Sequence, residues 1–110
     1  MDHFVRIYQL YDFYGDFLTA KQRQAVEWYF GHDLSLAEIA DEMDISRQAV
    51  HDLLRRSEQV LEAYEAKLGL AHRYEKHQQC FAELENLLRQ LEDTDSRWQR
   101  VFQLLAEVRE

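Results

Sequence analysis

The sequence predicts an all-α protein in which a helix-turn-helix core is followed by a long fourth helix and a C-terminal helical hairpin. The 110 residues contain no proline and only three glycines, whereas average usage would give about five prolines and about eight glycines. Apolar residues recur at steps of three and four along most of the chain, which is typical of helices. Residues that cap helices stand in front of several of these apolar stripes.

The first predicted helix runs from Asp2 to Tyr14, and Gly15 is placed to end it. Its broad apolar face is mostly aromatic and consists of Phe4, Val5, Ile7, Tyr8, Leu10, Tyr11, Phe13 and Tyr14. This face is wider than a short helix needs for one neighbour. Two interpretations therefore stay open: part of the face is buried against a second subunit, or its own domain covers all of it.

The second predicted helix runs from Ala20 to Phe30, with Thr19 as its N-cap and Gly31 at its end. A threonine hydroxyl accepts a hydrogen bond from a free backbone N–H, and glycine adopts the left-handed conformation that often ends a helix. The inward candidates include Val26, Tyr29 and Phe30.

A short third helix begins at Leu36, because Ser35 and Glu38 form a Ser-x-x-Glu capping box. Its apolar face consists of Leu36, Ile39, Ala40 and Met43. Asp44 stands where the chain must turn, and Asp tolerates the left-handed backbone that such a turn requires. Ile45 is expected to fill the angle between the helices, and Ser46 to cap the next helix.

The fourth helix is unusually long. Its apolar stripe steps by four and three without a break and consists of Val50, Leu54, Ser57, Leu61, Tyr64 and Leu68. With Gly69 as its end, about 22 residues at 1.5 Å each give roughly 33 Å, which is more than a helix-turn-helix needs. The second half of this helix must therefore pack on something else.

The remaining residues predict a helical hairpin. Its first helix carries an a/d seam of about three heptads, made of Tyr74, His77, Phe81, Leu84, Leu88 and Leu91. A polar turn, Asp93-Thr94-Asp95, follows, with Asp95 or Ser96 as the cap of the last helix. The stripe of that helix consists of Trp98, Val101, Phe102, Leu105 and Val108.

We therefore expect residues 1–69 to form a helix-turn-helix domain with an aromatic N-terminal helix, and residues 70–110 a helical hairpin. The hairpin is expected to be part of the same compact unit or a dimer interface. The heptad seam of the hairpin and the aromatic first helix predict a homodimer that buries more than about 1,000 Å² of surface. The interface candidates are Phe4, Tyr8, Tyr11, Tyr74, Phe81, Leu84 and Leu88.

The candidate nucleic-acid face lies on the outer side of the fourth helix, because helix-turn-helix proteins read the major groove with the start of this helix. Its residues are Arg47, Gln48, His51, Arg55 and Arg56, to which Lys21 and Arg23 add charge. Arg47 suits guanine and Gln48 suits adenine. The alternative is an ordinary solvated helix face.

The formal net charge of −8 argues against strong nucleic-acid binding by one subunit. The candidate face offers at most roughly five phosphate contacts. Acidic residues surround it, namely Glu38, Asp41, Glu42, Asp44 and Asp52. We therefore expect binding of DNA or RNA to be weak or to depend on a dimer.

Other function classes find little support. No nucleophile–base pair or phosphate-binding glycine loop appears, so we expect no enzyme activity and no cofactor. His72, His77 and Cys80 offer no second pair of metal ligands, so no metal is expected. No segment is apolar enough to span a membrane and no signal peptide is evident. With a single cysteine, this predicts a cytoplasmic protein without membrane insertion.

Residues Leu18 to Leu70 resemble the YlxM-type helix-turn-helix proteins of bacteria. The resemblance rests on LTAKQ, DLSLAEIA, SRQAV and LEAYEAKL, and the aromatic opening FVRIYQLYDFYGDFL and the chain length also fit. The core is also similar to the promoter-reading C-terminal domain of bacterial sigma factors, where a similar LTAKQR begins the preceding helix.

The resemblance implies a dimeric, all-α protein that helps to regulate the signal recognition particle pathway of protein targeting. The main hypothesis is therefore a sigma-like regulatory protein that binds operator DNA or the particle's RNA through its helix-turn-helix. The alternative is a protein–protein interaction module, without DNA reading, that contacts the signal recognition particle GTPase or its ribonucleoprotein. Its acidic charge suits a basic partner.

Overall fold

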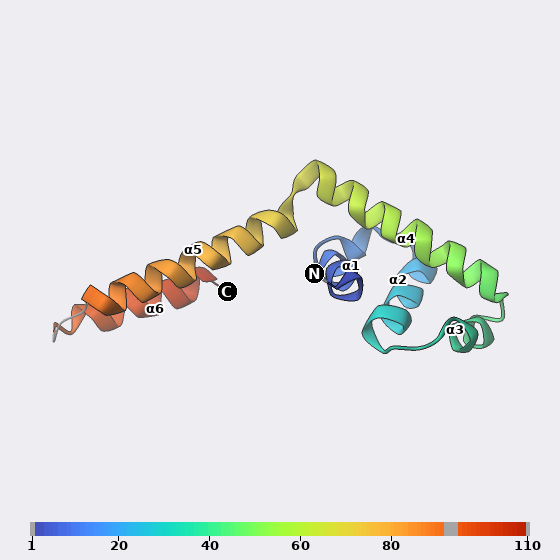
Figure 1. The fold of residues 1–110 in the computed structure, drawn as a ribbon, viewed down its shortest axis with the longest axis horizontal. Helices are drawn as coiled ribbons and strands as arrows, with labels where there is room; N and C mark the ends of the chain where they lie inside the picture. The colour runs from blue at the N-terminus through green and yellow to red at the C-terminus, as the bar shows by residue number, and fades with distance from the viewer. Residues whose placement is uncertain (1, 92–94, 110) are drawn as a thin grey trace. The chain divides into compact units, whose positions relative to one another are not determined.

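The computed structural model describes residues 2–91 and 95–109, and within these ranges it contains six α-helices and no strand. Figure 1 shows their order along the chain. The chain divides into two compact units, residues 1–71 and residues 72–110. The all-α class that the sequence predicts is confirmed, and each unit is described by itself below.

Helix α1 (His3–Tyr14) begins at Asp2, whose carboxylate accepts a hydrogen bond from the backbone N–H of Phe4. Its buried residues are Ile7, Leu10 and Tyr14. Gly15 ends the helix in a right-handed conformation and begins a 3₁₀ turn, η1 (Gly15–Phe17). Glycine is required here for a different reason from the one expected: a Cβ would lie 2.7 Å from the Tyr11 ring.

The second helix is shorter than predicted. Helix α2 (Ala20–Val26) begins with a capping box between Thr19 and Gln22, but a π-helical turn, η2 (Glu27–Gly31), replaces its last turn. The backbone N–H of His32 accordingly bonds to the carbonyl of Glu27, five residues back. A π turn adds one residue to the helical repeat, and here it contains three consecutive aromatic side chains, Trp28, Tyr29 and Phe30.

Helix α3 (Leu36–Met43) and the turn that follows it agree with the predicted helix-turn-helix. Ser35 and Glu38 form the reciprocal capping box, and Asp44 takes the left-handed conformation with φ of 56°. The prediction that Ile45 fills the angle between the two helices is wrong, because 36% of this residue is exposed. The covered apolar residues near the turn are Ala40, which is 5% exposed, and Val50, which is fully buried.

Helix α4 (Arg47–Leu68) has the predicted length of 22 residues and ends at the left-handed Gly69. The predicted inward stripe is confirmed at Val50, Leu54, Ser57 and Leu61, which are buried. It is wrong at its last member, because Leu68 is 42% exposed. The Ser57 hydroxyl donates to the backbone carbonyl of Leu53 at 2.8 Å, so it carries no unsatisfied polar group into the core. The helix packs on α1, α2 and α3.

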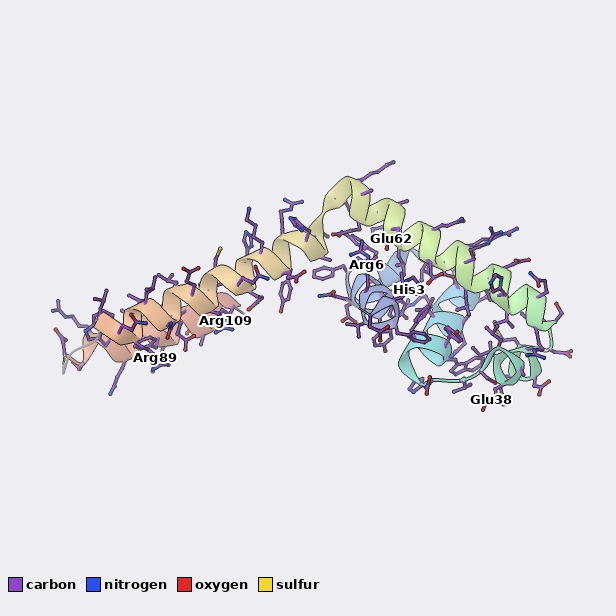
Figure 2. The ribbon with its side chains drawn as sticks, in the orientation of Figure 1. His3, Arg6, Glu38, Glu62, Arg89 and Arg109 are labelled. Carbon is purple, nitrogen blue, oxygen red and sulfur yellow. The ribbon has the colours of Figure 1, made fainter. Side chains whose placement is uncertain are left out.

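Two contacts between α1 and α4 bring together residues more than fifty positions apart in the sequence. Arg6 donates two hydrogen bonds of 2.9 Å to the carboxylate of Glu62, and Figure 2 shows these side chains pointing toward each other. At the other end of α1, the buried Tyr14 hydroxyl donates to Glu65 at 2.6 Å. Burial, with this hydrogen bond, raises the pKa of Tyr14 above its ordinary value.

The same two side chains cap the start of helix α5 (Leu70–Leu91). The backbone N–H of Leu70 donates to the Tyr14 hydroxyl at 3.0 Å, and that of Ala71 donates to the Glu65 carboxylate at 3.1 Å. These groups would otherwise be free at a helix N-terminus. The break between α4 and α5 is therefore held by side chains of the first unit.

In the second unit, α5 pairs with helix α6 (Arg97–Arg109). Arg109 bonds to Glu85 at 2.9 Å and its carbonyl accepts from Gln78, while the Arg89 guanidinium lies 4.1 Å from the centre of the Phe102 ring. Arg89 first, and Arg109 with it, hold the pKa of Glu85 below its ordinary value. Charged, polar and cation–π contacts thus join α5 to α6.

Asp95 accepts a hydrogen bond from the backbone N–H of Arg97 and pairs with its side chain at the start of α6. This agrees with the expected cap. The other two residues of the predicted polar turn, Asp93 and Thr94, lie outside the described residues.

Candidate nucleic-acid interface

The N-terminal half of α4 presents all five of the predicted binding residues to solvent. Ser46 caps the helix by accepting from the backbone N–H of Ala49 at 3.0 Å. Because Val50 and Leu54 point into the core, the opposite side of this segment faces outward. The exposed residues there are Arg47, Gln48, His51, Arg55 and Arg56.

The exposed residues fall into two rows of different charge. Arg47, His51 and Arg55 follow one another at steps of four, so they lie along one side of the helix. Gln48 begins the other row and donates to the carboxylate of Asp52 at 3.2 Å. His51 of the first row lies 3.8 Å from the same carboxylate. Asp52 therefore gives the second row a negative charge, which the first row lacks.

The three arginines of this segment are available to a ligand. Arg47, Arg55 and Arg56 form no ion pair with any residue that the structure describes. A guanidinium without a carboxylate partner need not give up an ion pair to bind phosphate. The first row, with two such arginines and no carboxylate of its own before Glu58, is the better phosphate-binding surface.

Lys21 and Arg23 are exposed on α2, and Arg23 pairs with an acidic residue of η1. Arg23 lies 3.5 Å from Asp16, and the next residue, Phe17, stacks on Tyr64 at 4.3 Å. Tyr64 is seventeen residues after Arg47 on α4, about 25 Å along the helix axis. Arg23 therefore lies toward the end of α4 that is distant from Arg47.

Acidic residues are exposed on α3, the helix that precedes α4 and packs on it. Hydrogen bonds from the Ser35 backbone and hydroxyl hold the pKa of Glu38 below its ordinary value, so its negative charge persists into mildly acidic solution. Asp41 and Glu42 are also exposed on α3. These charges repel phosphate and leave the α4 rows as the usable part of the surface.

Beside the first row lies a hollow of about 330 Å³ that the sequence does not reveal. His51 and Arg55 line one side, and Glu58 continues their row. His3, labelled in Figure 2, enters from α1 and bonds to Glu58 at 2.5 Å. The spacing of 51, 55 and 58 places these three residues on one side of α4, but no local pattern indicates His3, which is 55 residues away.

The remaining lining of this hollow is apolar. Phe4 comes from α1, Tyr29 and Phe30 from η2, and Leu36 and Leu54 from α3 and α4. The sequence identifies Tyr29 and Phe30 only as inward-facing residues. In the structure they are half-buried and form part of a surface that a ligand can reach.

The predicted interface residues of α1 differ in their surroundings. Phe4 and Tyr8 are each 37% exposed and line a second hollow, of about 360 Å³, with Val5. Tyr11 instead is half-buried and donates to Glu27 at 2.5 Å within the first unit. The first unit therefore leaves part of the aromatic face of α1 uncovered.

The predicted interface residues of α5 also divide. Phe81 and Leu88 are half-buried and lie on the side of α5 that carries Glu85, which contacts α6. Tyr74 and Leu84 remain 48% and 44% exposed. Further exposed apolar residues of the second unit are Leu87, Leu91, Leu104 and Val108.

Among the described residues, no three His, Cys, Asp or Glu side chains are grouped so that they could hold a metal ion. Within the same part of the chain, no helix combines the length and the apolar character that crossing a membrane requires.

The sequence is similar to those of several bacterial proteins. Residues 1–101 match the model of the family UPF0122, described as "Putative helix-turn-helix protein, YlxM / p13 like". A UPF0122 protein of Desulforamulus reducens is 47% identical over 88 residues, which cover 80% of this chain and 75% of that protein. One of Shouchella clausii is 50% identical over 84 residues, covering 76% and 77%. One of Bacillus mycoides is 41% identical over 103 residues, covering 94% of each.

Proposed function

The chain belongs to the UPF0122 family of YlxM/p13-like helix-turn-helix proteins, and from this premise we propose that it is a non-enzymatic regulatory protein that binds nucleic acid through α4. The observation that carries the proposal is the exposed row of Arg47, His51 and Arg55, whose arginines have no carboxylate partner among the described residues. Guanidinium groups on the outer side of a helix-turn-helix suit the phosphates and base edges of a groove.

The setting we propose is the cytoplasmic signal recognition particle pathway, which the resemblance to YlxM-type proteins implies. Either operator DNA or the RNA of the particle presents the phosphates that this row would bind. A second candidate is a protein–protein interaction module that contacts the particle's GTPase. The observation that favours it is the aromatic and apolar surface of α1 that the first unit leaves exposed, which includes Val5 and Tyr8.

The two candidates predict opposite results in a nuclease-treated capture experiment. Tagged protein is incubated with the purified particle, with and without complete digestion of its RNA, and the bound GTPase is measured. If the protein binds the RNA of the particle, digestion should abolish capture, because the GTPase is then held only through RNA. If it binds operator DNA alone, the particle should not be captured with or without digestion. Capture that survives digestion would favour the interaction module.

We also propose that the second unit forms the homodimer, because a two-helix hairpin alone covers few of its apolar side chains. Leu84, Leu87 and Leu91 follow one another at helical spacing on α5 and are 44%, 49% and 71% exposed. Leu104 and Val108 of α6 are 44% and 62% exposed. A second hairpin packed on these residues would make a four-helix arrangement, the usual way in which such stripes are buried.

Sedimentation at micromolar concentration tests the dimer. The wild-type protein should sediment at about twice the 13.3 kDa of the chain, and the Leu84→Glu/Leu87→Glu variant as a monomer, because burying two carboxylates is costly. Leu68→Glu is the control, since this leucine is similarly exposed, at 42%, but lies on α4. A wild-type monomer would contradict the proposal, and so would a dimer that both glutamates leave intact.

A further inference from the structure

The hollow beside the first row of α4 combines an aromatic wall with a polar rim. The rings of Phe4, Tyr29 and Phe30 form a triangle, with centroids 5.0 to 5.2 Å apart. Phe4 is 37% exposed, so part of its ring is open to solvent. The rim carries His51 and Arg55, which belong to the proposed nucleic-acid surface.

The size of the hollow suits a planar ring system. A cavity of about 150 Å³ is enough to hold benzene, and this hollow measures about 330 Å³. Aromatic side chains bind nucleobases by stacking, and one stacked base contributes enough affinity for about a tenfold effect. The volume and the lining therefore both suit one nucleobase.

The polar groups of the rim suit the rest of a nucleotide. Arg55 makes no ion pair with the residues described here, so it can bind the phosphate next to the inserted base. Glu58 is 24% exposed, and its carboxylate can accept from an exocyclic amino group of the base. His3, which bonds to Glu58, holds that carboxylate at the wall of the hollow.

We propose that this hollow binds one unpaired nucleobase of an RNA hairpin, with the adjacent phosphate on Arg55. The inference rests on the proposed nucleic-acid function and names the ligand of that same surface. RNA is the favoured nucleic acid because its bulges and loops present unstacked bases, which proteins recognise by stacking. A base of intact duplex DNA would first have to leave its stack at a cost of a few kcal/mol.

The test compares two RNA hairpins that differ by one bulged adenosine, titrated by fluorescence anisotropy at fixed salt. The wild-type protein should bind the bulged hairpin about tenfold more tightly. Phe4→Leu keeps an apolar side chain of similar volume but removes the aromatic plane, so it should abolish this preference and leave binding of the paired hairpin unchanged. Phe17→Leu, at an aromatic residue that is 56% exposed outside the hollow, should retain the preference.

A second measurement uses the unmodified protein and so does not depend on the folding of a variant. A hairpin with 4-thiouridine in place of the bulged base is irradiated with the protein, and the crosslinked residue is identified by mass spectrometry. Crosslinks should form at Phe4, Tyr29 or Phe30. A crosslink confined to residues outside the hollow would overturn the proposal.

The remaining outcomes separate this inference from the proposed function. Equal binding of both hairpins by the wild type would overturn the base-binding hollow and leave nucleic-acid binding in place. Tighter binding of a DNA duplex of the same sequence than of the bulged RNA hairpin would also overturn the base-binding hollow and leave nucleic-acid binding in place. Failure to bind any of these nucleic acids would overturn both proposals.

Discussion

Replacing Arg47 and Arg55 together with alanine is expected to weaken nucleic-acid binding by more than tenfold at fixed salt. Both guanidinium groups are exposed on one side of α4, and neither has a carboxylate partner in the described ranges. Each phosphate contact that is lost also removes about 0.9 from the slope of log K against log salt on duplex DNA. The double variant should therefore bind more weakly and also depend less on salt.

Fluorescence anisotropy at several salt concentrations measures both effects. Lys76→Ala/Arg100→Ala is the matched control, because it removes two positive charges from exposed positions on α5 and α6 and so reports the contribution of net charge alone. A double variant with unchanged affinity and salt slope would remove this face of α4 from the binding surface. A loss as large in the control would mean that binding follows overall charge.

The second large effect concerns the core that holds α4 in place. Leu61 is fully buried in the second half of the helix, one turn after Ser57. Leu61→Ala should lower the free energy of unfolding by about 2 to 5 kcal/mol, because it removes buried methyl groups and leaves a cavity. Urea denaturation followed by circular dichroism measures the change.

Leu68→Ala is the comparison for this prediction. Leu68 lies on the same helix and is 42% exposed, so its replacement should cost about 1 kcal/mol or less. Similar losses at the two positions would contradict the packing of the second half of α4 in the first unit. That packing explains why the helix is longer than a helix-turn-helix requires.

The net charge of −8 and a nucleic-acid function are compatible in physical terms. Charges on solvent-exposed side chains are largely screened beyond about 8 Å at physiological salt. Only the acidic residues close to Arg47 and Arg55 therefore weaken phosphate binding appreciably. Asp52 is the nearest of these along α4, and its contacts with Gln48 and His51 partly occupy its carboxylate.

The helix boundaries that the sequence predicts well are those set by local chemistry. Ser35 and Glu38 are three residues apart, so their capping box is readable in four letters and appears in the structure as expected. The left-handed Asp44 and the end of α4 at Gly69 follow from the same kind of local signal. Interactions between residues three or four apart decide such boundaries before any tertiary contact forms.

The predictions that failed depend on how side chains share space. The predicted helix continues from Ala20 to Phe30, whereas in the structure a π turn occupies Glu27–Gly31. Ile45 looks suited to a helix crossing by its position, yet Ala40 and Val50 fill that crossing and leave it exposed. In both cases the outcome depends on packing against other elements, which periodicity does not contain.

The sequence by itself determined the all-α class, the helix-turn-helix and the length of α4, because apolar periodicity and capping residues act within one or two helical turns. Only the tertiary structure decided where Arg23 lies relative to Arg47. Arg23 pairs with Asp16 and lies toward the distant end of α4. The tertiary structure also decided the hollow beside Arg55, which needs His3 and Glu58 to meet across 55 residues. Contacts at such separations depend on the packing of whole helices, and no local pattern records them.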